Sequence, residues 1–124
     1  AWRRWVEDGD WQSAAVALLH LGDDALKAGN PTLARKYYDR ARYLFSLRVS
    51  PTQRQNEAAA LYGMGLAEVV LRHVDAALEL FERARRLLAE ARRDWLTLGN
   101  QNQAARCEEA EARLKDMIEE GLEV

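Results

Sequence analysis

The chain has 124 residues, of which 48% are hydrophobic and 31% charged, a composition that excludes a disordered chain and fits one domain. A net charge of −2 at pH 7 gives no overall attraction to nucleic acid or to anionic lipid. The single cysteine cannot form an internal disulfide, no signal-peptide pattern opens the chain, and the apolar runs are far shorter than the ~20 residues that cross a bilayer. We therefore expect a cytoplasmic domain with no membrane partner.

Helix breakers divide the chain into segments of helical length, and the helix formers Ala, Leu, Arg and Glu dominate between them. At Gly29-Asn30-Pro31, the glycine can end one helix, Asn30 can cap the next and Pro31 fits its first position. Ser50-Pro51-Thr52-Gln53 is typical of a capping box, in which Ser50 caps and Gln53 reaches back. The breakers predict a short piece at 2–8 and five long helices at 11–28, 32–48, 53–71, 75–97 and 101–120.

Apolar residues recur within these segments at the spacing of one helix face, and no alternating pattern predicts a strand. Two such faces are formed by Leu18, Leu21, Gly22, Ala25 and Leu26 and by Ala77, Leu80, Phe81, Ala84, Leu87 and Leu88. Short connections make neighbouring helices antiparallel. The fold class predicted is therefore all-α, with about five to six helices arranged as antiparallel hairpins.

An internal repeat links the two central helix pairs. Leu18, Leu21, Gly22, Ala34, Tyr38 and Ala41 correspond, 43 residues later, to Leu61, Met64, Gly65, Ala77, Phe81 and Ala84. The small residues let helix backbones approach, while Tyr38 and Phe81 fill the space beside them. This pattern resembles the tetratricopeptide repeat, although the unit exceeds the usual length of about 34 residues. The resemblance implies hairpins stacked as a right-handed solenoid in a single domain, 1–124, with the clearest units at 14–48 and 57–90 and partial units at both ends.

The resemblance also implies a function and a site. In tetratricopeptide proteins, the first helix of each pair lines a concave groove that receives peptides. Transferred position by position, the binding groove would include Leu19, Asp23, Lys27, Tyr62 and Leu66. Leu19 and Asp23 stand where the carboxylate-binding members have Lys and Asn, so that type of clamp is not supported. We expect an apolar groove for a helical or extended segment, in a scaffold that belongs to a larger regulatory protein.

Tryptophans are concentrated at the start of the chain, where Trp2, Trp5 and Trp11 fall within eleven residues. They have two interpretations. A terminal repeat has to cover its exposed core, and these side chains can do so. They can equally form a docking or self-association surface, because exposed tryptophan is enriched in binding hot spots. Homo-oligomerisation through the terminal repeats is therefore one expectation.

Basic residues gather on the second and third expected helices, opposite an acidic C-terminal part. A solvated face is the ordinary explanation, and an acidic or nucleic-acid partner is the alternative, which would give binding that weakens steeply with salt. The basic surface consists of Arg35, Lys36, Arg40, Arg42, Arg48 and Arg54.

No combination of residues predicts catalysis, a metal site or a cofactor. His20 and His73 have no cysteine or carboxylate at metal-ligand spacing. Carboxylates beside Cys107 raise a thiol pKa and make it a poor nucleophile. Gly63-Met64-Gly65 falls inside an expected helix, where close packing explains it. We expect a non-enzymatic module whose partner is a protein or peptide.

Overall fold

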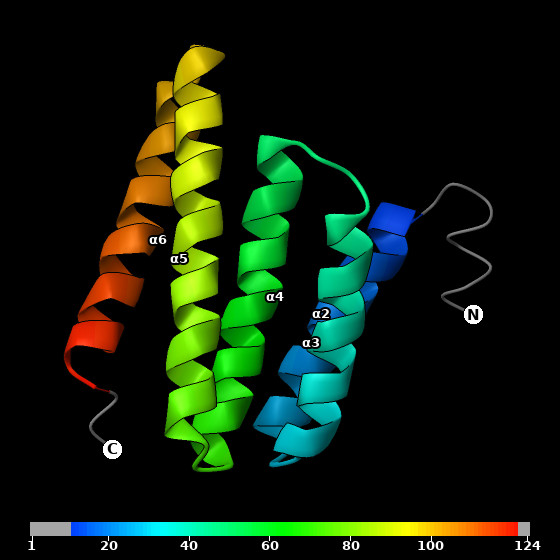
Figure 1. The fold of residues 1–124 in the computed structure, drawn as a ribbon. Helices are drawn as coiled ribbons and strands as arrows, with labels where there is room; N and C mark the ends of the chain where they lie inside the picture. Colours follow the sequence, from blue (N-terminus) through cyan, green and yellow to red (C-terminus); the bar gives the residue numbers. More distant parts are fainter. Residues whose placement is uncertain (1–10, 122–124) are drawn as a thin grey trace.

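The protein was analysed as a computed structural model, which describes residues 11–121. This part of the chain forms five helices and no strand, so the all-α prediction is confirmed. Each helix runs antiparallel to the next, and the helices lie side by side in chain order (Figure 1). None of them has the length and apolarity that a membrane-crossing helix needs. The helices are α2 (Trp11–Lys27), α3 (Pro31–Ser46), α4 (Pro51–Val70), α5 (Val74–Thr97) and α6 (Gln101–Glu119).

The observed helix boundaries lie within two residues of the predicted ones, and the predicted N-caps at Asn30 and Ser50 are formed. Asn30 Oδ1 accepts a hydrogen bond from the Leu33 amide at 3.2 Å, and Ser50 Oγ accepts one from the Gln53 amide at 3.1 Å. The second half of the predicted capping box is not formed, because Gln53 Oε1 accepts from Asn56 Nδ2 at 3.4 Å instead. Helix α3 ends at Ser46, and Ser50, which precedes a proline, is extended, with φ −161° and ψ 159°.

Glycines and aromatic rings set the closest helix approaches. The Tyr38 ring, from α3, lies between Gly22 of α2 and Gly63 of α4: a Cβ added to either glycine would come 2.7 Å or 2.5 Å from the ring. Phe81 of α5 lies in the same way against Gly65 of α4. The predicted pairing of small residues with Tyr38 and Phe81 is therefore confirmed, and Gly63 joins it.

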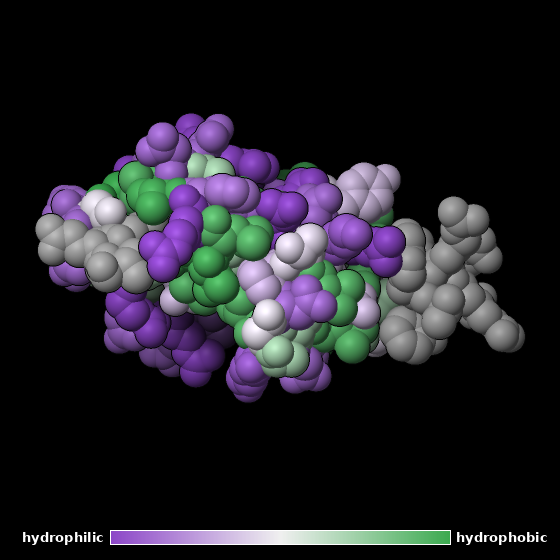
Figure 2. Space-filling view, turned by 90° about the horizontal axis from the view of Figure 1, so that it is seen from below, coloured by the Kyte–Doolittle hydropathy of each residue, from purple (hydrophilic) through white to green (hydrophobic). Residues whose placement is uncertain are grey.

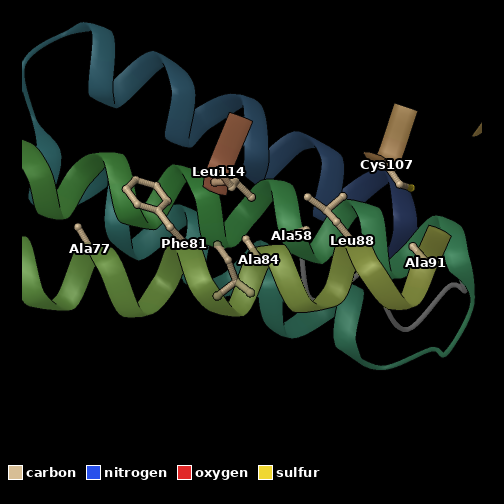
Figure 3. Close-up of a cluster of buried hydrophobic side chains, with 9 residues drawn as sticks. Ala58, Ala77, Phe81, Ala84, Leu88, Ala91, Cys107 and Leu114 are labelled. Atoms are coloured by element: carbon tan, nitrogen blue, oxygen red, sulfur yellow. The ribbon is translucent and has the colours of Figure 1, made fainter. Parts of the chain in front are cut away.

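The core runs through all five helices. Figure 3 shows Ala77, Phe81, Ala84, Leu88 and Ala91 along one face of α5, with side chains of α4 and α6 completing the cluster. A second cluster, between α2, α3 and α4, contains Ala14, Leu18, Leu44, Phe45 and Ala60. Leu21, which the spacing places on the packed face, is 44% exposed.

Ion pairs link α4 to the helices on both sides of it. Glu68 of α4 is 4% exposed and lies 2.7 Å from the Arg35 guanidinium of α3 and 2.8 Å from His73 Nδ1. Burial by itself raises the pKa of Glu68, but the hydrogen bonds from Arg35 and His73 outweigh burial and lower it overall. At the other end of α4, Arg54 pairs with Glu90 and Asp94 of α5. These contacts anchor α4, the helix that carries the candidate site.

Candidate functional site

A groove of about 560 Å³ separates α4 from α6. Helix α4 forms one wall and α6 the other, and Leu88 of α5 contributes to the lining between them. In the order of the hairpins, α4 and α6 are the first helices of two successive pairs. The groove is lined by Gln55, Ala58, Ala59, Tyr62, Leu88, Arg106, Ala110, Arg113, Leu114, Asp116 and Met117.

The groove exists because α6 does not approach α4 closely. Helices α2 and α4 touch each other, with Gly22 and Gly63 on the two sides of Tyr38. Helix α6 has no glycine, and its direct contact with α4 is slight at most. It packs instead on α5 through Ala104, Cys107 and Leu114. A gap therefore remains between the two first helices.

The interior of the groove is apolar, and three of its lining residues are alanines. Ala58 and Ala59 on α4 face Ala110 on α6, so neither wall fills the space. Tyr62 is 38% exposed, and its ring is tilted against Phe81 with 5.6 Å between the ring centroids. An apolar groove with an aromatic side chain held in place can bury an apolar side chain of a partner protein.

Charged residues of α6 border this interior. Arg106 and Arg113 line the groove and are exposed, and Asp116 lies one turn beyond Arg113. Within residues 11–121, neither arginine forms an ion pair. The neighbouring Arg92 behaves differently, because it pairs with Glu111 at 2.7 Å across the α5–α6 contact.

The structure disperses the residues expected to line the binding groove. Tyr62 lies in the groove between α4 and α6, whereas Leu66 is half-buried against the α4–α5 core. Leu19 is half-buried against the α2–α3 core, and Asp23 accepts a hydrogen bond from the Tyr38 hydroxyl at 2.5 Å. Lys27 is exposed in the last turn of α2. Of the five, only Tyr62 lies in this groove, and a binding role for the others stays a prediction.

Sequence reasoning missed the α6 wall of the groove. Arg106, Ala110, Arg113 and Met117 recur at intervals of four, three and four residues, which places them on one helix face. They lie beyond the clear repeat, so no correspondence with an earlier unit selects them. The spacing was visible in the sequence, but only the packing shows that this face borders α4.

The basic surface is largely engaged in contacts within the chain. Arg35 pairs with Glu68, Arg42 with Asp39 at 3.1 Å, and Arg54 with Asp94. The Arg48 guanidinium lies 5.2 Å from the centroid of the Trp11 ring. In the described part of the chain, Lys36 and Arg40 are exposed and in no ion pair. A nucleic-acid role for this surface stays a prediction without a supporting contact.

The remaining candidates are the tryptophans near the start of the chain and Cys107. Trp11 is half-buried against the α2–α3 core, whereas Trp2 and Trp5 lie outside the described residues. Burial, and then the Glu111 carboxylate, raise the pKa of the Cys107 thiol, in the direction that the sequence predicts. Residues 11–121 contain no cluster of three or more metal-ligating side chains.

An apolar patch covers the end of the molecule where α4 turns into α5. Figure 2, seen from this end, shows hydrophobic residues gathered among hydrophilic ones. Leu33 at the start of α3 and Val70 at the end of α4 are exposed hydrophobic residues.

The helix hairpins and their glycine–aromatic packing define a helical-repeat protein. The family model for the tetratricopeptide repeat matches residues 13–90, more than half of the chain. The chain belongs to the tetratricopeptide repeat family, whose repeats are generally protein–protein interaction modules. The match spans α2 to most of α5, so the α6 wall of the groove lies beyond it. A comparison with curated proteins finds no match.

Proposed function

We propose that this protein is a scaffold that binds an apolar segment of another protein in the groove between α4 and α6. The observation that carries the proposal is the apolar groove of about 560 Å³ between two successive first helices. In the family, first helices face the peptide-binding side, so the position of the groove agrees with that use. Its volume accommodates several side chains of a partner, and the partner's backbone lies along the rim.

Tyr62 is the expected energetic centre of binding. Its ring is supported from below by Phe81 and is 38% exposed, so a partner side chain can bury the open part. Rigid aromatic residues in such a position often contribute most of the binding energy of an interface. Ala59 lies on the same wall and is exposed, so a larger side chain there would occupy the groove.

The proposal is tested by selecting peptides on the folded protein from a displayed library of random peptides. Selected peptides should bind Tyr62→Ala and Ala59→Trp at least tenfold more weakly than wild type, which corresponds to about 1.4 kcal/mol. The measurement is fluorescence anisotropy with each labelled peptide. Circular dichroism of every variant verifies that the helices are retained.

Matched controls separate the groove from the rest of the surface. Tyr43→Ala removes a tyrosine that is 54% exposed on α3, and Ala112→Trp adds a tryptophan at an exposed alanine of α6 that does not line the groove. Both should bind the selected peptides as wild type does. Peptides that bind Ala59→Trp undiminished, or a selection that yields none, would show that the groove is not the binding site.

A further inference from the structure

We infer that the groove recognises an acidic amphipathic helix, in which two carboxylates one heptad apart flank an apolar anchor. This inference rests on the proposed function and specifies the chemistry of its partner. The carboxylates would pair with Arg106 and Arg113, and the apolar anchor would enter between Tyr62 and Leu88.

The two arginines are placed as a pair. They are seven residues apart on α6, which is two turns of the same helix face and about 10 Å along its axis. Both line the groove, with Ala110 between them. Glutamates at positions i and i+7 of a bound helix have the same separation, so one helix lying along α6 can meet both arginines.

The arginines are also available. Arg35, Arg54 and Arg92 each bridge two helices of the fold through a carboxylate. Arg106 and Arg113 form no such bridge within residues 11–121, although Glu109 stands within a turn of each on α6. Their guanidinium groups therefore keep the capacity to bind a partner's carboxylate with two parallel hydrogen bonds.

The apolar surroundings strengthen these contacts. A charge pair beside a groove filled by apolar side chains is shielded from water and is worth more than the same pair on an open surface. Asp116 lies at the far end of the lining and repels a further carboxylate beyond Arg113. The charge order along α6 thus favours acids opposite Arg106 and Arg113 and disfavours an acid beyond Arg113.

The test uses the peptides selected on the wild-type protein. The selected set should be enriched in helix-forming sequences with Glu or Asp at i and i+7 around Leu, Phe or Met. Replacing both acids with Gln or Asn should weaken binding at least tenfold. The Arg106→Glu/Arg113→Glu variant should bind the acidic peptides more weakly by a similar factor. It should bind peptides with Lys at the two positions more tightly than it binds the acidic ones.

A second double variant controls for net charge. Arg86 and Arg93 are exposed on α5, are also seven residues apart and do not line the groove. Arg86→Glu/Arg93→Glu changes the total charge equally and should leave binding of the acidic peptides within twofold of wild type. This comparison separates a local contact from long-range attraction.

The outcomes distinguish the two proposals. Three results would overturn this inference and leave the groove function standing. The selected peptides could lack paired acids, or they could bind as extended segments. They could also bind Arg106→Glu/Arg113→Glu as they bind wild type while losing affinity for Tyr62→Ala. Peptides unaffected by Tyr62→Ala and Ala59→Trp overturn the groove function itself. Reversed preference for Lys peptides in the double variant, with the matched α5 control unchanged, supports both.

Discussion

Tyr38 occupies a close crossing of α2, α3 and α4. Its ring, 1% exposed, lies between the backbones of α2 and α4 at Gly22 and Gly63, and its hydroxyl reaches Asp23. Burial and the Asp23 hydrogen bond raise the pKa of this hydroxyl, which donates to the Asp23 carboxylate. A buried ring in contact with two helices cannot turn away. The positions beside it therefore require glycine, because a larger residue would clash with the ring.

The alanine substitution Gly63→Ala measures this constraint. Alanine normally stabilises a helix interior by about 1 kcal/mol relative to glycine, but overpacking a filled site costs about 1–3 kcal/mol. The new Cβ would lie 2.5 Å from the Tyr38 ring, so we expect a net loss of up to about 2 kcal/mol in the free energy of unfolding. Urea denaturation followed by circular dichroism gives the value.

Replacing Tyr38 separates the steric effect of its ring from the helix propensity of alanine. In a Tyr38→Leu background, the same Gly63→Ala change should become neutral or stabilising by up to ~1 kcal/mol, because helix propensity then acts alone. An equal loss in both backgrounds would show that the Tyr38 ring is not what demands glycine at position 63.

Among the elements, three turns share one geometry. The turns after α2, α4 and α5 place Gly29, Arg72 and Gly99 at positive φ angles of 81°, 65° and 79°. In each, the next residue donates to a carbonyl five residues back, as His73 does to Glu68 at 2.8 Å. This is the Schellman arrangement, which satisfies the last carbonyls of the helix. Only the turn after α4 has a side chain at the left-handed position.

Arg72 is therefore the strained member of the three turns. A residue with a Cβ loses about 1 kcal/mol or more in the left-handed conformation, while glycine adopts it without a steric cost. Arg72 is exposed and in no ion pair within the described residues, so Arg72→Gly should raise the free energy of unfolding by about 0.5–1 kcal/mol. Thermal denaturation should show a higher midpoint.

The reverse change provides the control. Gly99 has the same conformation and open space around it, so Gly99→Ala should lower the midpoint by a similar amount for conformational reasons alone. If Arg72→Gly instead lowers stability, the arginine side chain contributes a contact larger than its backbone strain.

In the whole molecule, each helix packs chiefly on the helix before and the helix after it in the chain. Among the helices of residues 11–121, α3, α4 and α5 each pack on the helix before and the helix after, whereas α2 and α6 come first and last in the chain (Figure 1). In such quasi-one-dimensional arrays, stability is a sum of nearest-neighbour terms, and terminal elements open first.

Hydrogen exchange should reveal this gradient. We expect backbone amides in the middle of α4 and α5 to exchange at least ~10-fold more slowly than those of α6, measured by mass spectrometry at neutral pH. Bound peptide should slow exchange in α6 and α4 together, because it bridges the two helices. Uniform protection across α2 to α6 would instead show one cooperative unit.

The sequence predicts the fold of this protein better than it predicts the candidate site. The helices follow from local features, because Asn30 and Ser50 act through bonds to amides three residues ahead. The candidate site depends on which faces meet. The family pattern places Tyr62 and Leu66 together as groove residues, whereas in the structure Tyr62 lines the groove beside α6 and Leu66 is half-buried against the α4–α5 core.

The sequence by itself determined the helix order, the caps, and the pairing of Gly22 and Gly65 with Tyr38 and Phe81, because each depends on chain-local spacing or on a repeat visible in the letters. Only the tertiary structure decided where the groove lies. Its width follows from how far α6 stays from α4, and that distance results from side-chain volume summed across three helices. No local pattern encodes such a sum, so Arg106 and Arg113 gained significance only when α6 was placed beside α4.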